Sequence, residues 1–99
     1  VREVDPGGEK KRVCIAVEMI YKPSLLILDE PTSGLDSHKA GRVLKTLKKL
    51  ASQGHTVIFT IHQPSYLLYS MLDRLVLLNN GETIYQGEAS RIEKYLLSL

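Results

Sequence analysis

Short apolar runs and helically spaced apolar positions follow one another along this sequence. Residues 25–28 and 56–61 are apolar or β-branched throughout. Runs of that length between turn formers are typical of strands covered on both faces, as in a parallel sheet. Between them, apolar side chains recur at helical spacing over residues 40–51, and Gly54 is a usual stop for a helix. The pattern predicts a strand, a helix and a second strand parallel to the first.

A further helix is expected near the start of the sequence. It should begin just after the glycine pair Gly7-Gly8, because apolar residues then recur at helical spacing. A glycine-rich helix start suits an anion, since the helix dipole is positive there and no side chain blocks the backbone. A plain helix entry would explain a lone glycine pair equally well. The expected apolar face of this helix consists of Val13, Ala16, Val17 and Ile20.

The last third of the sequence predicts smaller elements. Residues 66–71 indicate a short helix and residues 74–78 a third strand. The dipeptide Asn80-Gly81 signals a tight turn, which would make residues 83–86 the partner strand of a hairpin. A final amphipathic helix is expected, with an apolar face of Ala89, Ile92, Tyr95, Leu96 and Leu99.

Polar side chains that could bind a ligand or take part in catalysis stand where the two expected parallel strands end. Asp29 and Glu30 follow the first strand, and His62 follows the second. A right-handed crossover brings both carboxyl ends to one edge of the sheet, where ligands of such sheets bind. Taken singly, the two acids could merely end a strand in solvent, and His62 could be an ordinary polar residue. After the first strand, Asp36 or Ser37 is the expected N-cap of the central helix.

Composition narrows the range of functions. The 99 residues have room for one small domain, and the net charge of +2 gives no support to a nucleic-acid partner. The single cysteine, Cys14, lies in an apolar stretch and is expected to be buried and unreactive in a reducing compartment. No signal peptide and no apolar run of ~20 residues is present, so this piece alone is expected to be soluble or peripheral. Basic residues crowd one face of the central helix, most simply as a solvated face rather than a lipid contact.

Three ordered motifs resemble the ATP-binding-cassette (ABC) ATPases. Residues 25–36 read LLILDEPTSGLD, which resembles the Walker B strand and D-loop of that family. Residues 60–65 read TIHQPS, which is similar to the H-switch in the form used by the G subfamily of pigment, sterol and drug half-transporters. Residues 4–12 read VDPGGEKKR and resemble the signature motif, usually V-S-G-G-E-x-K-R in that subfamily. The resemblance covers residues 1–99.

The resemblance implies an α/β fold with a parallel sheet, a P-loop NTPase-like partial domain spanning residues 1–99, with ATP and Mg²⁺ as cofactors. Asp29 would hold Mg²⁺, usually through water, and Glu30 would orient or deprotonate the attacking water. His62 would donate to the γ-phosphate. The residues implied to face a second ABC ATPase domain are Ser33 and Asp36 at the domain interface, and Gly7, Gly8 and Glu9 toward the nucleotide of that domain.

The sequence departs from the family pattern in two ways. The phosphate-binding loop G-x-x-x-x-G-K-[ST] is absent, as are the aromatic adenine contact and the Q-loop, so the sequence is expected to be the C-terminal portion of a nucleotide-binding domain and inactive alone. In the signature, Pro6 stands where the family has serine and Asp5 adds a negative charge beside the expected triphosphate. We expect this change to impair the composite site.

Three functions remain open. The first is part of the ATP-hydrolysing domain of a membrane exporter of a lipid, sterol or xenobiotic, held at the cytoplasmic face by the transmembrane domain of the parent protein. The second is a piece of a soluble ABC ATPase of translation or chromosome maintenance. The third is a degenerate fragment that binds partners without hydrolysis. No nucleic-acid partner is expected for the first, and about six apolar spans in the parent protein would favour it.

Overall fold

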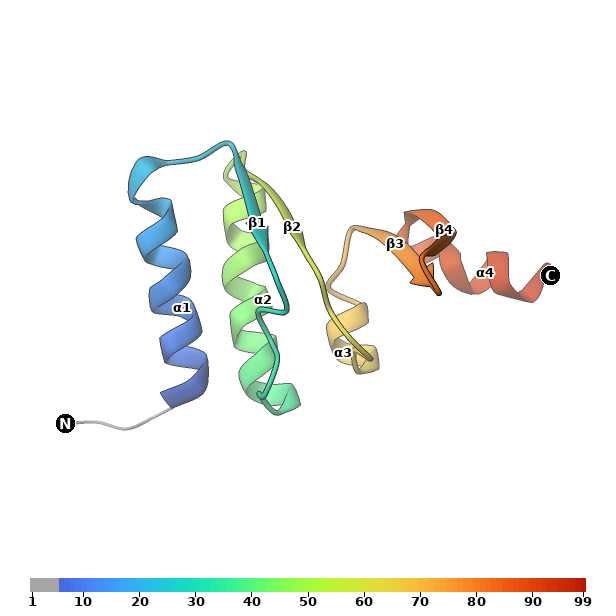
Figure 1. Ribbon diagram of the computed structural model, residues 1–99, viewed down its shortest axis with the longest axis horizontal. Coiled ribbons are helices and arrows are strands. Elements are labelled where there is room, and N and C mark those ends of the chain that lie inside the picture. Colours follow the sequence, from blue (N-terminus) through green and yellow to red (C-terminus); the bar gives the residue numbers. More distant parts are fainter. Residues whose placement is uncertain (1–5) are drawn as a thin grey trace.

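The computed structural model describes residues 6–99 of the chain (Figure 1). In chain order the elements are α1 (Pro6–Glu18), η1 (Met19–Tyr21), β1 (Leu25–Leu28), α2 (Ser37–Ser52), β2 (Thr56–Phe59), α3 (Tyr66–Tyr69), β3 (Arg74–Asn79), β4 (Glu82–Glu88), η2 (Ala89–Arg91) and α4 (Ile92–Leu97), with η denoting a 3₁₀ turn.

The predicted strand–helix–strand unit is confirmed. Strands β1 and β2 are parallel and pair directly, with Leu25 opposite Thr56 and Leu28 opposite Phe59. The sequence alone left open whether they are immediate neighbours. The ladder continues one residue past β2, because the backbone N–H of Thr60 donates to the carbonyl of Leu28 at 3.1 Å. The carboxyl ends of the two strands are therefore held side by side.

Helix α2 lies at the centre of the packing. It contacts α1, β2 and α3, and its residue Val43 is fully buried. The expected N-cap is confirmed, since Asp36 Oδ1 accepts a hydrogen bond of 2.8 Å from the backbone N–H of Lys39. The core around this helix consists of Ile15, Leu26, Ala40, Val43, Leu44, Leu47 and Leu68.

Within the described residues 6–99 the sheet is covered on one face only, which corrects the expectation of strands buried on both sides. Leu26 is buried and Leu28 packs against the core, whereas the alternate residues Ile27 and Ile58 are 68% and 53% exposed. These two lie opposite each other in the register, so they share the bare face. A run of apolar residues predicts a strand with two apolar faces. It does not show whether another element packs on the second face of the sheet. Parallel sheets usually carry such a layer on both faces.

Helix α1 presents a different face to the core from the one predicted. It begins at Pro6 and includes both glycines, and Ile15 and Met19 pack inward. The predicted apolar face is instead exposed, and so is Cys14, which was expected to be buried. The reason lies in the run of apolar residues at 13–17, which offers apolar side chains on every side of the helix. The exposed members of the predicted face are Val13, Ala16, Val17 and Ile20.

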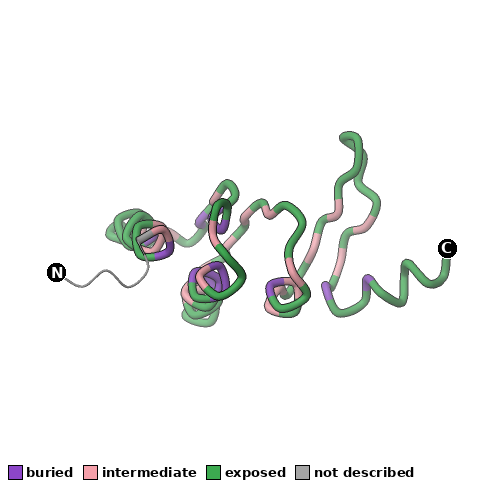
Figure 2. Tube along the Cα trace, turned by 90° about the horizontal axis from the view of Figure 1, so that it is seen from below, coloured by how far each residue is buried: buried purple, intermediate pink, exposed green. Residues whose placement is uncertain are grey.

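The hairpin of β3 and β4 and the final helix extend away from the α1–α2–sheet layers, in a molecule of 52 × 29 × 24 Å (Figure 1). The hairpin and its Asn80-Gly81 turn confirm the prediction. In the last helical segment Ala89 and Ile92 are buried, but Tyr95, Leu96 and Leu99 are exposed, contrary to the predicted apolar face. Figure 2 shows how much of this end of the chain is exposed.

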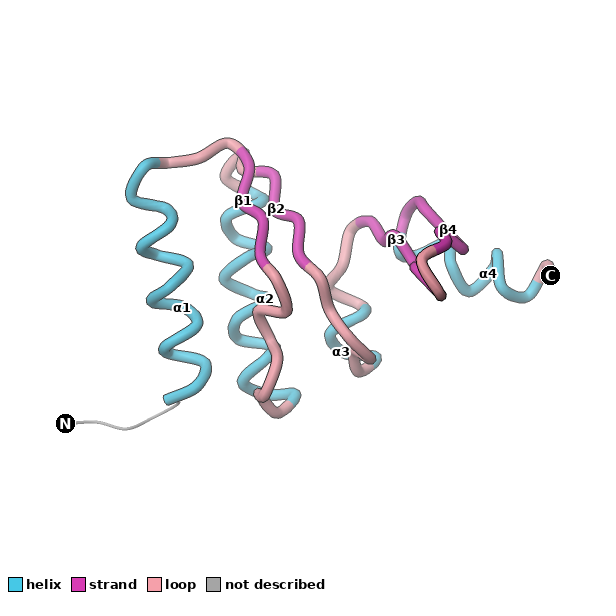
Figure 3. The backbone as a smooth tube through the Cα atoms, viewed as in Figure 1, coloured by secondary structure: helices cyan, strands magenta, loops and turns pink. Residues whose placement is uncertain are grey.

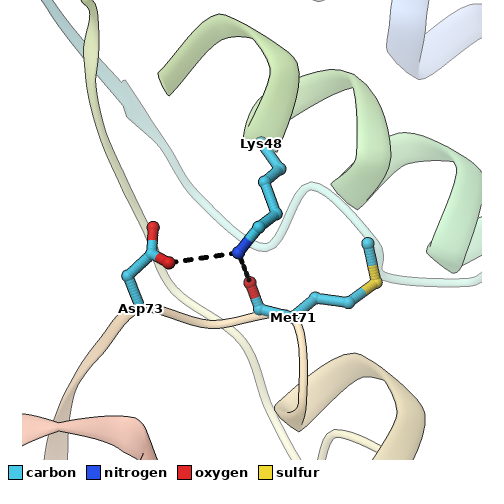
Figure 4. Close-up of polar contacts among 3 residues, drawn as sticks. All are labelled: Lys48, Met71 and Asp73. Atoms are coloured by element: carbon cyan, nitrogen blue, oxygen red, sulfur yellow. Dashed lines mark hydrogen bonds and ion pairs between the residues drawn. The ribbon is translucent and has the colours of Figure 1, made fainter. Parts of the chain in front are cut away.

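One contact of α2 ties the core to the start of the hairpin (Figure 4). Lys48 Nζ lies 3.1 Å from Asp73 Oδ1 and donates at 3.1 Å to the carbonyl oxygen of Met71. Lys48 is one of several basic residues of α2. An exposed ion pair of this kind contributes only about 0.2–1 kcal/mol, so its main effect is to orient the segment before β3.

We expect the bare sheet face to cause self-association of this chain in isolation, because it combines exposed apolar residues with unpaired strand edges. Ile27→Lys should raise the monomer fraction in sedimentation velocity. The matched control is Leu67→Lys, a residue 56% exposed on α3 and outside this face. Equal behaviour of the two variants would show that association does not use the sheet face.

Candidate functional site

The segments carrying the candidate site residues gather toward one end of the α1–α2–sheet layers. In Figure 3 the beginning of α1, the loop between β1 and α2 and the loop after β2 all lie toward the lower part of the view. This arrangement follows from the topology, because both parallel strands run the same way and α2 returns between them. Segments separated by more than fifty residues of sequence are thus brought to a common end.

A hydrogen-bonded cluster joins the two strand ends. The hydroxyl of Thr60 donates to Asp29 Oδ1 at 2.6 Å, and the backbone N–H of Glu30 donates to the same Thr60 oxygen at 2.8 Å. All three residues are exposed, so their polar groups remain accessible to solvent or ligand. The two acids predicted from sequence are therefore adjacent to a side chain of the second strand. The sequence analysis gave Thr60 no role of its own, because its bond to Asp29 depends on a register between strands that the sequence does not show.

The loop after Glu30 is tightly structured. Glu30 adopts a left-handed backbone conformation with φ of 47°, and Gly34 follows with φ of 78°. The Glu30 carbonyl accepts from the Ser33 N–H at 3.1 Å, and the Thr32 carbonyl accepts from the Leu35 N–H at 3.3 Å. These successive turns, with proline as the first central residue of one of them, bend the chain sharply from β1 toward α2.

The other predicted interface residues lie on this loop. Ser33 is exposed and takes part in the turn through its backbone N–H. Asp36 is exposed too, but its carboxylate accepts from Lys39 as the cap of α2. A role of Asp36 at a domain interface would therefore have to coexist with its role as a cap.

The first turn of α1 packs against the same loop. A Cβ atom at Gly7 would lie 2.7 Å from Leu35 Cδ2, so a side chain there would displace Leu35. Gly8 is buried, and Glu9 is exposed in the first turn. Of the two unusual signature residues, Asp5 lies outside the described residues and Pro6 begins α1. The contact supplies a structural reason for glycine at position 7 that is independent of any ligand.

His62 follows the paired end of β2 and is exposed. The next residue, Gln63, has φ of 47°, so the chain turns sharply directly after the histidine. Ser65 then caps α3, its hydroxyl accepting from the Leu68 N–H at 3.3 Å. His62 thus stands in the short turn that leads from β2 to α3.

The donor set around Asp29 fits a hydrated divalent cation. The hydrogen bond from Thr60 is accepted by Oδ1 of Asp29. Asp29 is exposed, so its second oxygen, Oδ2, is accessible to a ligand. Within residues 6–99 no group of three or more His, Cys, Asp or Glu side chains could hold a metal ion. A single carboxylate suits Mg²⁺, which retains waters and commonly takes its remaining ligands from substrate phosphates.

None of the helices in residues 6–99 combines the length and the apolar character needed to cross a membrane.

Two family profiles match the chain, one described as ABC transporter over residues 6–33 and one described as ABC-2 type transporter over residues 62–99. ABC transporter G family member 14 of Arabidopsis thaliana is 59% identical over 93 residues, which make up 94% of this chain and 14% of that protein. The broad substrate specificity ATP-binding cassette transporter ABCG2 of Mus musculus is 48% identical over 92 residues, or 93% of this chain and 14% of that protein. This chain belongs to the G family of ABC transporters.

Solved structures confirm the predicted fold of this G family chain. An ATP-binding cassette of an ABC transporter in its ADP conformation matches with a TM-score of 0.81 and 26% identity, over 93% of this chain and 36% of that one. The cbiO1 protein of Clostridium perfringens, part of the ABC transporter complex cbiONQ, matches with a TM-score of 0.76 and 33% identity, over 92% of this chain and 37% of that one. The G family chain therefore has the α/β fold of part of an ABC ATPase domain, and it spans only 14% of the two relatives named above.

Proposed function

We propose that the chain is part of the ATP-hydrolysing domain of an ABC exporter, with residues 1–99 contributing the signature, Walker B, D-loop and H-switch segments. The observation that carries this proposal is the cluster at the carboxyl ends of β1 and β2, where Thr60 bonds both Asp29 and Glu30. Phosphoryl transfer to water depends on a held cation, an oriented water and donors to the phosphates. This strand edge contains residues suited to the first two tasks.

Asp29 would hold Mg²⁺, most simply through a water molecule on its free oxygen. Bound there, the cation would neutralise charge on the phosphates of ATP. Glu30 would orient the attacking water and accept its proton. Glu30 leaves the extended strand conformation with a φ of 47°, and we propose that this turn lets two consecutive acids perform two different tasks.

The remaining site residues would serve a dimer with a second ABC ATPase domain. His62 would donate a hydrogen bond to the γ-phosphate from the turn after β2. Ser33 and Asp36 would lie at the interface, and Gly7, Gly8 and Glu9 in the first turn of α1 would face the nucleotide bound by the partner. The contact between the first turn of α1 and Leu35 supports a common surface for these segments.

The exporter assignment rests on the G family relatives. For the complete protein we propose a transmembrane domain as partner, with the ATPase part at the cytoplasmic face of a membrane. The mouse relative is named for its broad substrate specificity. For the protein that carries this chain we propose a lipid, sterol or xenobiotic as the transported substrate.

The test is ATP-driven transport by the complete protein in vesicles. His62→Ala should lower ATP turnover and transport about tenfold or more, because the γ-phosphate loses a hydrogen bond worth ~1.5–3 kcal/mol. ATP binding should change much less. His38→Ala is the matched control, an exposed histidine in the first turn of α2.

Stimulation of turnover by ribosomes or DNA, with no transport into vesicles, would reject the exporter assignment in favour of a soluble ABC ATPase. Normal ATP turnover in the His62→Ala variant would show that His62 is not part of the proposed site. The exporter assignment would then still be tested by the transport assay.

A further inference from the structure

The structure contains a side chain that connects the two acids of the site and to which the sequence analysis gave no role, although it opens the TIHQPS motif. We propose that Thr60 is a positioning residue for phosphoryl transfer, whose hydroxyl holds the Asp29 carboxylate and the Glu30 backbone in their working arrangement. This inference rests on the function proposed above. It concerns a residue that acts through its neighbours and does not itself touch the nucleotide.

The location of Thr60 follows from strand register. Leu28 lies opposite Phe59 in the last pair of the ladder, and Asp29 and Thr60 are the residues that follow directly on the two strands. The backbone N–H of Thr60 donates to the Leu28 carbonyl at 3.1 Å, so the two chain segments stay hydrogen-bonded one residue beyond Phe59. Paired residues of a parallel sheet point to the same face, so the hydroxyl and the carboxylate are brought together. The 2.6 Å bond between them is the result.

The hydroxyl is used in both directions. It donates its proton to Asp29 Oδ1 and accepts the N–H of Glu30 at 2.8 Å. A hydroxyl is suited to this place because it is both a donor and an acceptor. Valine has the same shape but no hydroxyl, so the Asp29 carboxylate would lose its donor and the Glu30 N–H would lose its acceptor. Threonine also restricts χ1, so it holds the hydroxyl in one orientation more firmly than serine would.

The bond to Glu30 supports an unfavourable backbone conformation. A non-glycine residue with φ of 47° costs free energy and persists only where its surroundings hold it. Here the N–H of Glu30 is held by Thr60 and its carbonyl is held by the N–H of Ser33. Thr60 therefore fixes one of the two backbone groups that determine where the Glu30 side chain is directed.

The same residue joins the two chain segments of the site. Thr60 stands two positions before His62, and its side chain is bonded to the strand end that carries Asp29 and Glu30. Loss of the hydroxyl should free the Asp29 carboxylate and loosen the Glu30 turn together. Mg²⁺-dependent nucleotide binding and the catalytic step should then both suffer, whereas binding of nucleotide without Mg²⁺ should not.

The experiment compares Thr60→Val and Thr60→Ser in the complete protein. Three quantities are measured: kcat and KM for ATP, the Mg²⁺ concentration for half-maximal turnover, and affinity for a fluorescent non-hydrolysable ATP analogue with Mg²⁺ and with EDTA. For Thr60→Val we expect kcat to fall about tenfold and the half-saturating Mg²⁺ concentration to rise about tenfold, since a hydrogen bond to a charged group is lost. Analogue affinity should fall with Mg²⁺ present and stay unchanged in EDTA.

Serine and a second threonine provide the controls. Thr60→Ser keeps the hydroxyl and should remain within about threefold of the parent in every quantity. Thr56→Val changes an exposed threonine at the other end of β2 and should leave them unchanged. If Thr60→Val does not fold, the same three quantities are compared between Thr60→Ala and Thr60→Ser. Only Thr60→Ser retains the hydroxyl, so a difference between these two variants tests its role.

Each result bears on one proposal. Parental Mg²⁺ dependence in Thr60→Val, or equal losses in Thr60→Ser and Thr60→Ala, would overturn the role of the hydroxyl while the ATPase function stands. Absence of Mg²⁺-dependent ATP hydrolysis and binding in the parent itself would overturn the proposed function. Selective loss in Thr60→Val with recovery in Thr60→Ser would establish Thr60 as the positioning residue.

Discussion

Glu30→Gln is expected to abolish ATP turnover in the complete protein while leaving ATP binding intact. An amide keeps the size and shape of the side chain but cannot accept a proton from water, and a general base typically contributes 10²- to 10⁴-fold. We therefore expect kcat to fall at least about a hundredfold. Steady-state hydrolysis and equilibrium nucleotide binding measure the two quantities separately.

The matched control for this change is Glu93→Gln, an exposed acid in the first turn of α4, at the far end of the chain from the site. It should leave kcat unchanged. Near-parental hydrolysis by Glu30→Gln would show that another group orients the water and that the end of β1 serves a different purpose. Loss of both binding and turnover would point instead to a disturbed loop, since the Glu30 backbone is part of two hydrogen bonds.

Leu47→Ala should lower the free energy of unfolding by about 2–5 kcal/mol, as expected for a buried leucine that leaves a cavity. Leu47 is only 2% exposed and belongs to the core around α2. The loss is a large share of the stability of a small domain, so we expect a marked drop in the urea midpoint followed by far-UV circular dichroism in dilute solution.

Leu97→Ala serves as the control for this stability change. Leu97 is also helical, in α4, but it is 81% exposed. Its replacement should change the unfolding free energy by no more than about 0.5 kcal/mol, because alanine is a good helix former and little buried surface is lost. Similar midpoints for the two variants would mean that α2 is not the centre of a cooperative core.

Elements defined by local signals could be predicted from the sequence. Helix α2 combines strict apolar spacing with a capping aspartate, and both features act within a few residues of each other. The β3–β4 hairpin follows in the same way from its Asn80-Gly81 turn. The parallel arrangement of β1 and β2 also follows, because a right-handed crossover leaves little choice of topology.

The sequence also predicted where the candidate site residues stand along the chain, and their roles stay predictions. Asp29 and Glu30 follow β1 directly, and His62 follows β2 after two further residues, so the parallel topology directs both segments toward one edge of the sheet. The motif resemblance named the same residues and also the G family, and the relatives confirm the family. Their chemical roles remain proposals for the experiments described above.

Tertiary packing decided the rest. The face of α1 that is buried depends on where α2 lies, because five consecutive apolar residues from Val13 to Val17 give no preferred side. The bare face of the sheet depends on what packs against β1 and β2, which an apolar run cannot specify. The role of Thr60 depends on a register between strands about thirty residues apart, and a hydrogen bond of that kind leaves no periodic signal in the sequence.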